Sequence, residues 1–152
     1  MPVYTIRHAQ IEDVDGLQEL YLKHLTPFPP KETQDAARWS ALLALLMANP
    51  DYHLLVGEVD GRVIASVTLV IIRNLTHNLR PYAVIENVVT HADFRNKGHA
   101  SKLLDKAGEI AQESNCYKIM LMTGSKREET LRFYERCGYS RAEKTAFLKR
   151  LT

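Results

Sequence analysis

The chain has 152 residues, 45% of them hydrophobic and 25% charged, with a formal net charge of +2. This is the length and composition of one ordinary soluble, globular domain, so we expect residues 1–152 to form a single domain. So small a net charge argues against a nucleic-acid partner, and the longest apolar runs are far too short to span a membrane.

Two features indicate a cytoplasmic location. Cys116 and Cys137 are too few for a disulfide framework and suit a reducing compartment. Residues 1–16 have neither the apolar segment nor the cleavage pattern of a signal peptide.

The apolar residues of the first half alternate between strand spacing and helix spacing. The expected elements are a strand at 3–9, helices at 11–21 and 39–46, and strands at 51–59 and 62–72. Prolines between positions 27 and 30 end the first helix, and Asn49-Pro50 ends the second. Asp60-Gly61 joins the last two strands, because a type I′ hairpin turn needs positive φ at both positions.

The second half continues as loop, strand, helix, strand and helix. We expect a polar loop at 73–81, a strand at 82–90, a helix at 100–110, a buried strand at 117–122, a helix at 131–137 and a final strand at 147–151. Gly138 is a good residue to end the last helix. Because a helix joins the strand near Val88 to the one near Ile119, these two strands should run parallel. The fold class is therefore α/β (α+β), with a mixed, mostly antiparallel sheet flanked by helices.

A basic turn lies between the strand at 82–90 and the helix that follows it. It reads Arg95-Asn96-Lys97-Gly98-His99-Ala100 and precedes a helix N-terminus, whose free N–H groups bind phosphate well. An ordinary helix start with a basic surface cluster explains these six residues equally well. The turn is neither a dinucleotide-binding G-x-G-x-x-G nor a Walker A motif.

Two motifs together resemble the GNAT family of N-acetyltransferases. Residues 95–100 are similar to its R/Q-x-x-G-x-G/A signature, which grips the pyrophosphate of coenzyme A, and residues 133–139 are similar to its F-Y-x-x-x-G-F block. The resemblance extends from about Val3 to Leu148. It implies transfer of an acetyl group from acetyl-CoA to an amine, by direct attack in a ternary complex and without a metal.

The resemblance also implies which residues bind acetyl-CoA. The strand before the signature is bulged in that family, and its backbone pairs with the pantetheine arm, with the Val88 N–H directed at the thioester oxygen. The implied binding residues are Val88, Val89, Thr90, Arg95, Asn96, Lys97, Gly98, His99, Ala100, Ser101 and Arg127. Arg127 stands where the family often has asparagine, so a contact with a CoA phosphate and a solvated helix start are both open there.

The reaction needs a base and an acid. Glu86 is the candidate base, acting directly or through a water, and burial would have to raise its pKa because a carboxylate in solution is a weak base. The alternative is a strand-edge carboxylate paired with an arginine such as Arg80. Should Glu86 not serve, His77 in the polar loop is the next candidate. Tyr134 is the candidate acid for the departing thiolate, and a packed core tyrosine is its alternative.

The acceptor is expected to be a primary amine of a small molecule. Lys31, Arg38, Arg73 and Arg80 suggest an acidic or phosphorylated amine, and the Glu86 strand is somewhat similar to glucosamine-6-phosphate acetyltransferases within the family. Amines of protein N-termini or lysines, or a non-catalytic acyl-CoA-binding module, are the alternatives. The six histidines show no metal-ligand spacing. Residues 145–151 and the helix around Leu42 offer surfaces for a homodimer.

Overall fold

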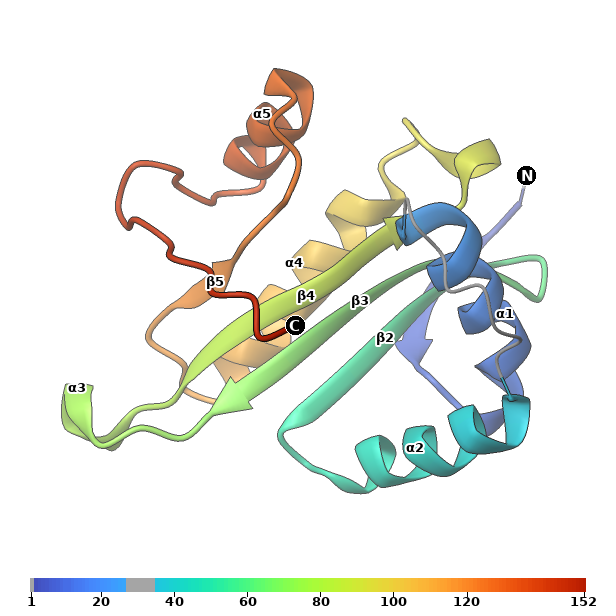
Figure 1. Ribbon diagram of the computed structural model, residues 1–152, viewed down its shortest axis with the longest axis horizontal. Helices are drawn as coiled ribbons and strands as arrows, with labels where there is room; N and C mark the ends of the chain where they lie inside the picture. The colour runs from blue at the N-terminus through green and yellow to red at the C-terminus, as the bar shows by residue number, and fades with distance from the viewer. Residues whose placement is uncertain (1, 27–34) are drawn as a thin grey trace.

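The computed structural model describes residues 2–26 and 35–152 (Figure 1). In chain order its elements are β1 (Tyr4–His8), η1 (Ile11–Asp13), α1 (Val14–Glu19), η2 (Leu20–Leu25), α2 (Ala36–Ala48), β2 (Tyr52–Val59), β3 (Arg62–Ile72), α3 (Thr76–Leu79), β4 (Tyr82–Thr90), η3 (Ala92–Phe94), α4 (His99–Glu113), β5 (Ile119–Leu121) and α5 (Glu128–Arg136). Within these ranges no helix is both long enough and apolar enough to cross a membrane.

The five strands form one mixed sheet in the order β1-β2-β3-β4-β5. Neighbouring strands are antiparallel except β4 and β5, which are parallel and joined by α4. Asp60 and Gly61, at φ 49° and 78°, make the hairpin turn between β2 and β3. The predicted mixed sheet, its parallel pair and its hairpin are therefore confirmed.

The sheet separates two hydrophobic cores, because successive strand residues point to opposite faces. Leu55 faces the core that contains Leu103 of α4, and α4 lies behind the sheet in Figure 1. Leu54, the next residue along β2, faces the core formed with Leu17 of α1 and Leu43 of α2. The two sides of the sheet thus have different coverings. The larger of the two cavities described below lies on the side covered by α1 and α2.

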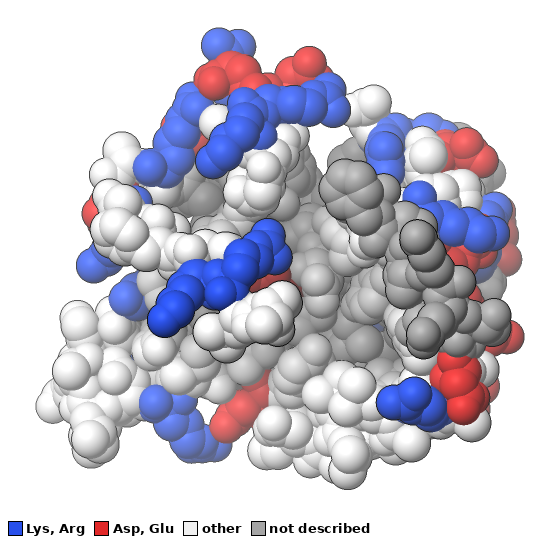
Figure 2. All heavy atoms as spheres, viewed as in Figure 1, with Lys and Arg blue, Asp and Glu red and all other residues white. Residues whose placement is uncertain are grey.

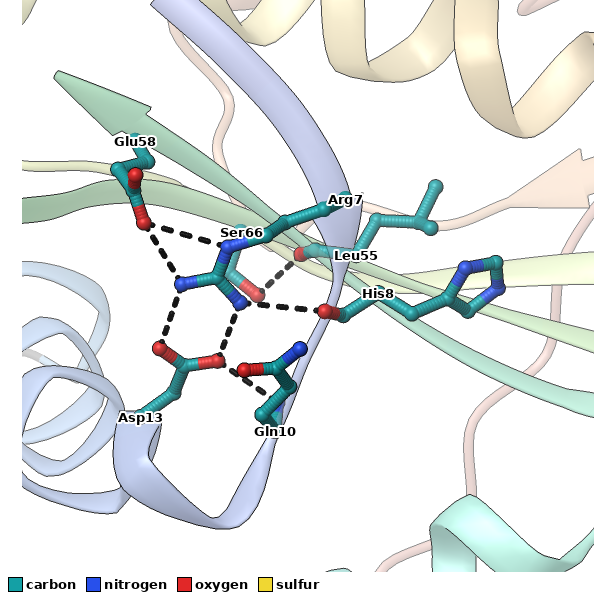
Figure 3. Close-up of polar contacts among 7 residues, drawn as sticks. All are labelled: Arg7, His8, Gln10, Asp13, Leu55, Glu58 and Ser66. Atoms are coloured by element: carbon teal, nitrogen blue, oxygen red, sulfur yellow. Dashed lines mark hydrogen bonds and ion pairs between the residues drawn. The ribbon is translucent and has the colours of Figure 1, made fainter. Parts of the chain in front are cut away.

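A partly buried ion-pair network fixes the first helix to the sheet (Figure 3). Arg7 of β1 donates two hydrogen bonds to Asp13, at 2.7 and 2.8 Å, and contacts Glu58 of β2 at 2.7 Å. Asp13 also accepts a hydrogen bond from the backbone N–H of Gln10 at 2.7 Å. Burial alone would raise the pKa of Asp13, but the hydrogen bonds from Arg7 and Gln10 outweigh burial and lower it. One carboxylate therefore joins β1, η1 and, through Arg7, β2.

The helices near the site begin and end at residues suited to those positions. Asp35 caps α2 by accepting a hydrogen bond from the Ala37 N–H at 2.9 Å. Gly138 follows α5 at φ 96°, and the N–H of Tyr139 reaches back to the carbonyl of Tyr134 at 3.0 Å. The predicted end of this helix is confirmed, and the carbonyl of Tyr134 accepts the hydrogen bond of the capping turn.

Three predictions about the second half need correction. The tail does not form the predicted strand at 147–151: no residue after Arg136 is in a strand, and Phe147 and Leu151 are 92% and 81% exposed. An alternating pattern needs a partner strand and a covered face, and the described residues supply the tail with neither. The strand predicted at 117–122 shortens to β5 and is only half-buried. The polar loop contains a tight turn with three successive positive φ angles, at residues 77–79.

Candidate active site

A bulge interrupts β4 where the candidate base lies. Thr68 of β3 pairs with Glu86 and Ser66 pairs with Val89, so Asn87 and Val88 together stand opposite the single residue between them. Asn87 adopts φ 55°, which re-aims the strand locally. The bulge that the resemblance implies is therefore present, and Glu86, Asn87 and Val88 at the bulge all line the cleft described next.

The first cavity, which we call the β4–β5 cleft, opens where these two strands separate. They pair only from Ala83 to Ile85 on β4 and from Ile119 to Leu121 on β5. Beyond that point lies a cavity of about 210 Å³. It is lined by Leu25, Ile85, Glu86, Asn87, Val88, Leu121, Met122, Thr123, Gly124 and Tyr134. Since the parallel strands are unpaired here, their backbone groups are free to bind an extended ligand.

The cleft brings Glu86 and Tyr134 together. Burial raises the pKa of Tyr134, and the nearby Cys137 and the Glu86 carboxylate raise it further, so the phenol keeps its proton at neutral pH. Glu86 is exposed, so it lacks the burial that was expected to make its carboxylate a stronger base. Within residues 2–26 and 35–152 no side chain forms an ion pair with Glu86, and Arg80 binds elsewhere. The alternative pairing with Arg80 is therefore wrong.

The basic turn leads from the end of β4 into α4. Gly98 adopts φ 83°, and a Cβ there would meet no atom within 4 Å, so the surface above the helix start is open. His99 packs against Tyr4 with ring centroids 4.2 Å apart, and the Tyr4 hydroxyl donates to the His99 carbonyl at 3.0 Å. Burial, Lys102 and Lys97 lower the pKa of His99, which keeps its ring neutral. An open, glycine-started helix end flanked by lysines fits a phosphate group.

Arg95 is engaged with the protein backbone. Its guanidinium donates to the carbonyl of Thr90 at 3.1 Å and to the carbonyl of His24 at 3.2 Å. It thereby holds the end of η2 against the end of β4, close to the basic turn. Lys97 and Lys102 lie over the rings of Phe94 and Tyr4, at 5.5 and 5.7 Å. The lysine charges, more than that of Arg95, remain available to an anion at the turn.

A second, larger cavity lies over the face of the sheet that α1 and α2 cover, and we call it the α2 cavity. Its volume is about 540 Å³. It is lined by Leu17, Tyr21, Asp35, Arg38, Trp39, Leu42, Leu43, Leu46, Tyr52, Leu54 and Asn87. Asn87 belongs to both cavities, so the β4 bulge is the point where they meet. Sequence reasoning missed this cavity because its walls come from five separate elements.

Comparisons with known proteins agree with this geometry. The family model described as "Acetyltransferase (GNAT) family" matches residues 15–139. The chain belongs to this family. A solved structure described as a putative acetyltransferase from Agrobacterium tumefaciens is 40% identical, with a TM-score of 0.87 and coverage of 96% of this chain and 99% of that one.

Two curated relatives are more distant in sequence. A glucosamine 6-phosphate N-acetyltransferase of Candida albicans is 28% identical, over 90% of this chain and 89% of the relative. An uncharacterised N-acetyltransferase of Methanocaldococcus jannaschii is 29% identical over 92% of this chain, which spans 62% of that relative's length. Both names place this GNAT chain among proteins described as N-acetyltransferases.

Arg127 lies at the start of α5, on the surface. Its side chain is 73% exposed and pairs with Glu129 at 3.0 Å. Figure 2 shows basic side chains, mixed with acidic ones, gathered over α5, and several of them pair with each other. This arrangement leaves both sequence-based readings of Arg127 open.

The basic residues expected near the acceptor lie in different parts of the structure. Arg73 pairs with Asp51 at 3.0 Å, and Arg80 donates to the carbonyls of Asn115 and Cys116 at 3.1 Å each. Neither arginine lines the β4–β5 cleft or the α2 cavity, whereas Arg38 lines the α2 cavity. Lys31 lies outside the described residues.

His77, the alternative base, lies away from both cavities. Its ring stacks on Tyr117 with centroids 3.7 Å apart, beside the turn that precedes β4. It lines neither the β4–β5 cleft nor the α2 cavity. The structure therefore gives no support to His77 as a substitute for Glu86.

Glu19, His24 and His91 form a polar cluster that sequence spacing did not indicate. Their nearest ligand-type atoms all lie within 4.8 Å of one another. Arg62 already contacts Glu19 at 3.2 Å and His91 at 3.0 Å, and backbone N–H groups of Ala92 and Asp93 point at the Nδ1 atoms of the two histidines. Because these contacts already engage the polar atoms, we interpret the three residues as a hydrogen-bonded cluster that joins η2 to the end of β4, and not as a metal site.

Proposed function

We propose that this chain is an acetyl-CoA-dependent N-acetyltransferase that acts on the primary amine of a small molecule. The observation that carries the proposal is the meeting of Glu86 and Tyr134 at the β4–β5 cleft, at a strand bulge. The open, basic start of α4 follows this strand after the short helix η3. Family membership and relatives described as N-acetyltransferases support it. In this family the acetyl group comes from acetyl-CoA.

In this proposal each cleft residue has one task. Acetyl-CoA supplies an activated acyl thioester, with its phosphates at the turn from Arg95 to Ser101 and its arm along Val88, Val89 and Thr90. The Val88 N–H donates to the thioester oxygen as negative charge develops there. Glu86, directly or through a water, takes a proton from the amine, and Tyr134 gives its proton to the sulfur that leaves.

Tyr134 keeps its proton in the cleft, although a raised pKa also makes the phenol a weaker acid. The hydroxyl remains protonated at neutral pH, so it is ready to donate when negative charge appears on sulfur. The proposal requires neither a metal nor a covalent acyl-enzyme. The two cysteines are unpaired, and we assign residues 1–152 to one domain of a cytoplasmic protein.

Homodimer formation is part of the proposal. The exposed apolar side chains Phe147, Leu148 and Leu151 lie on a tail without a strand partner, and Leu42, Leu45 and Met47 are exposed on α2. Burying such groups against a second copy would remove them from water. Light scattering at tens of micromolar protein tests this point separately from the enzymatic proposal.

An amine panel tests the enzymatic proposal. Release of free thiol from acetyl-CoA is followed with the chain and each amine in turn, and acetylated product is identified by mass spectrometry. Amine-dependent release is the expected result. The alternative of a non-catalytic acyl-CoA-binding module predicts binding without release, and a preference for peptide substrates would indicate a protein acetyltransferase.

A further inference from the structure

The α2 cavity is walled mainly by apolar groups. Eight of the eleven described residues that line it are leucine, tyrosine or tryptophan. Leu17, Leu43 and Leu54 also belong to the buried core on that face of the sheet, so these walls are fixed by packing. The rings of Tyr21 and Trp39 add aromatic surface, with centroids 5.9 Å apart. A cavity of about 540 Å³ with such walls has the size and character of a small-molecule site.

Among the described residues that line the α2 cavity, the charges cancel. Asp35 and Arg38, both exposed, contribute one negative and one positive charge. The Asp35 carboxylate is already engaged as the helix cap, where it accepts from the Ala37 N–H at 2.9 Å. The other polar groups among the described lining residues are the amide of Asn87 at the bulge, the hydroxyls of Tyr21 and Tyr52, and the indole N–H of Trp39. A single arginine beside a carboxylate does not favour a phosphorylated ligand.

Asn87 sets the direction in which a ligand would lie. It lines both the α2 cavity and the β4–β5 cleft, and its neighbour Glu86 lines the cleft. An amine that reaches the bulge from the α2 cavity therefore arrives beside the candidate base. The rest of such a molecule would lie among the leucines and aromatic rings.

A ligand with many hydroxyl groups and a phosphate would lose more hydrogen bonds to water here than these few, dispersed polar groups could replace. Methylene and aromatic groups would instead gain by leaving water. We propose that the α2 cavity is the acceptor site and that the acceptor is a primary amine on an apolar body, alkyl or aromatic, rather than an amino-sugar phosphate. This inference rests on the proposed function and names its substrate class.

A series of n-alkylamines, from propylamine to heptylamine, tests the inference. Their amino groups are chemically equivalent, so only the length of the apolar body changes. At saturating acetyl-CoA, kcat/KM should rise by about fourfold for each added methylene, because burying a CH2 group contributes about 0.8 kcal/mol, until the cavity is filled. Glucosamine 6-phosphate, measured in parallel, should be a poorer acceptor than hexylamine.

Two matched variants of α2 test whether the dependence on chain length arises in the α2 cavity. Leu42 lines the cavity and is 56% exposed, whereas Leu45 is 71% exposed on the same helix and does not line it. Leu42→Glu should lower kcat/KM for hexylamine by about tenfold or more and flatten the chain-length series. Leu45→Glu should leave both unchanged. Acetyl-CoA thermal shifts should equal those of the wild type in both variants, which shows that they remain folded.

The outcomes separate this inference from the proposed function. A flat chain-length series, or glucosamine 6-phosphate as the better acceptor, overturns the inference and leaves acetyl transfer intact. Equal losses in Leu42→Glu and Leu45→Glu also overturn it, because the cavity would then have no special role. Thiol release with none of the amines, in a protein that binds acetyl-CoA, overturns the proposed function and the inference with it.

Discussion

Glu86 of β4 and Tyr134 of α5 line the same cleft, although α4 and β5 separate them in the sequence. Burial, Cys137 and then Glu86 raise the pKa of Tyr134. The relationship is useful for transfer from a thioester, because a proton must leave the amine and another must reach the departing sulfur. The Glu86 carboxylate can accept the proton from the amine, and the protonated Tyr134 phenol can donate the proton to sulfur.

Tyr134→Phe should keep acetyl-CoA affinity and lower kcat by about 10²-fold, within the usual range for the loss of a general acid. Tyr139→Phe is the matched control: burial is the main cause that raises the pKa of Tyr139 to about 12, yet this residue does not line the cleft. Steady-state kinetics at saturating amine measures both. Wild-type turnover by Tyr134→Phe, with chemistry limiting, would leave Tyr134 as core packing alone.

Glu86→Gln removes the proton acceptor while keeping the size of the side chain. We expect kcat/KM to fall by about 10²-fold or more, with the acetyl-CoA thermal shift unchanged because the basic turn is untouched. Glu109→Gln, an exposed carboxylate on α4 that pairs with Lys106, should leave the rate unchanged. If Glu86→Gln retained the wild-type rate and pH profile, the amine would have to lose its proton to solvent or to another group.

Gly98 tests the phosphate-binding turn. Gly98→Asp puts a negative charge beside the expected pyrophosphate and should abolish the acetyl-CoA thermal shift. Gly98→Asn has nearly the same shape and also tolerates the positive φ found there, so it should retain part of the shift. Equal loss in the two variants would attribute the effect to backbone strain and argue against an anion at this place.

Asp13 tests the network that fixes η1 and α1 to the sheet. Asp13→Asn should lower the free energy of unfolding at pH 7 by about 2 kcal/mol, because a buried hydrogen bond to a charged partner is weakened. The pKa of Asp13 is lowered in the folded chain, so its contribution is present above the unfolded-state pKa of about 3.9 and is lost as the pH falls through the folded value.

Urea unfolding at pH 7 and at low pH measures this contribution. The difference between wild type and Asp13→Asn should be largest at pH 7 and should narrow below pH 4. Asp15→Asn, at an exposed position in the first turn of α1, is the control and should change stability little at either pH. A difference that did not vary with pH would show that packing, not the charge, is what Asp13 contributes.

Local sequence patterns predicted most of the fold. The turn at Asp60-Gly61, the end of α5 before Gly138 and the parallel pairing of β4 with β5 follow from backbone requirements that a few residues express. The prediction of a final strand was wrong for the opposite reason. Alternation at residues 147–151 is a local signal, whereas a strand also needs a partner, which lies elsewhere in space.

The candidate site was predictable only in part. The turn around Gly98 and the block containing Tyr134 each form a continuous motif, so the sequence indicated both. The α2 cavity and the carbonyl partners of Arg95 depend on segments brought together by folding, and no spacing within one segment reveals them. The exposure of Glu86 likewise follows from the bulge and the separation of β4 from β5.

The central claim is that the β4–β5 cleft and the start of α4 bind acetyl-CoA, and thermal unfolding tests it without knowledge of the acceptor. A ligand present at about a hundred times its Kd stabilises the native state by about 2.7 kcal/mol, which raises Tm by roughly 5–10 °C in a domain of this size. We predict such a rise with acetyl-CoA and none with NAD or ATP at the same concentration. No shift at millimolar acetyl-CoA would contradict the account.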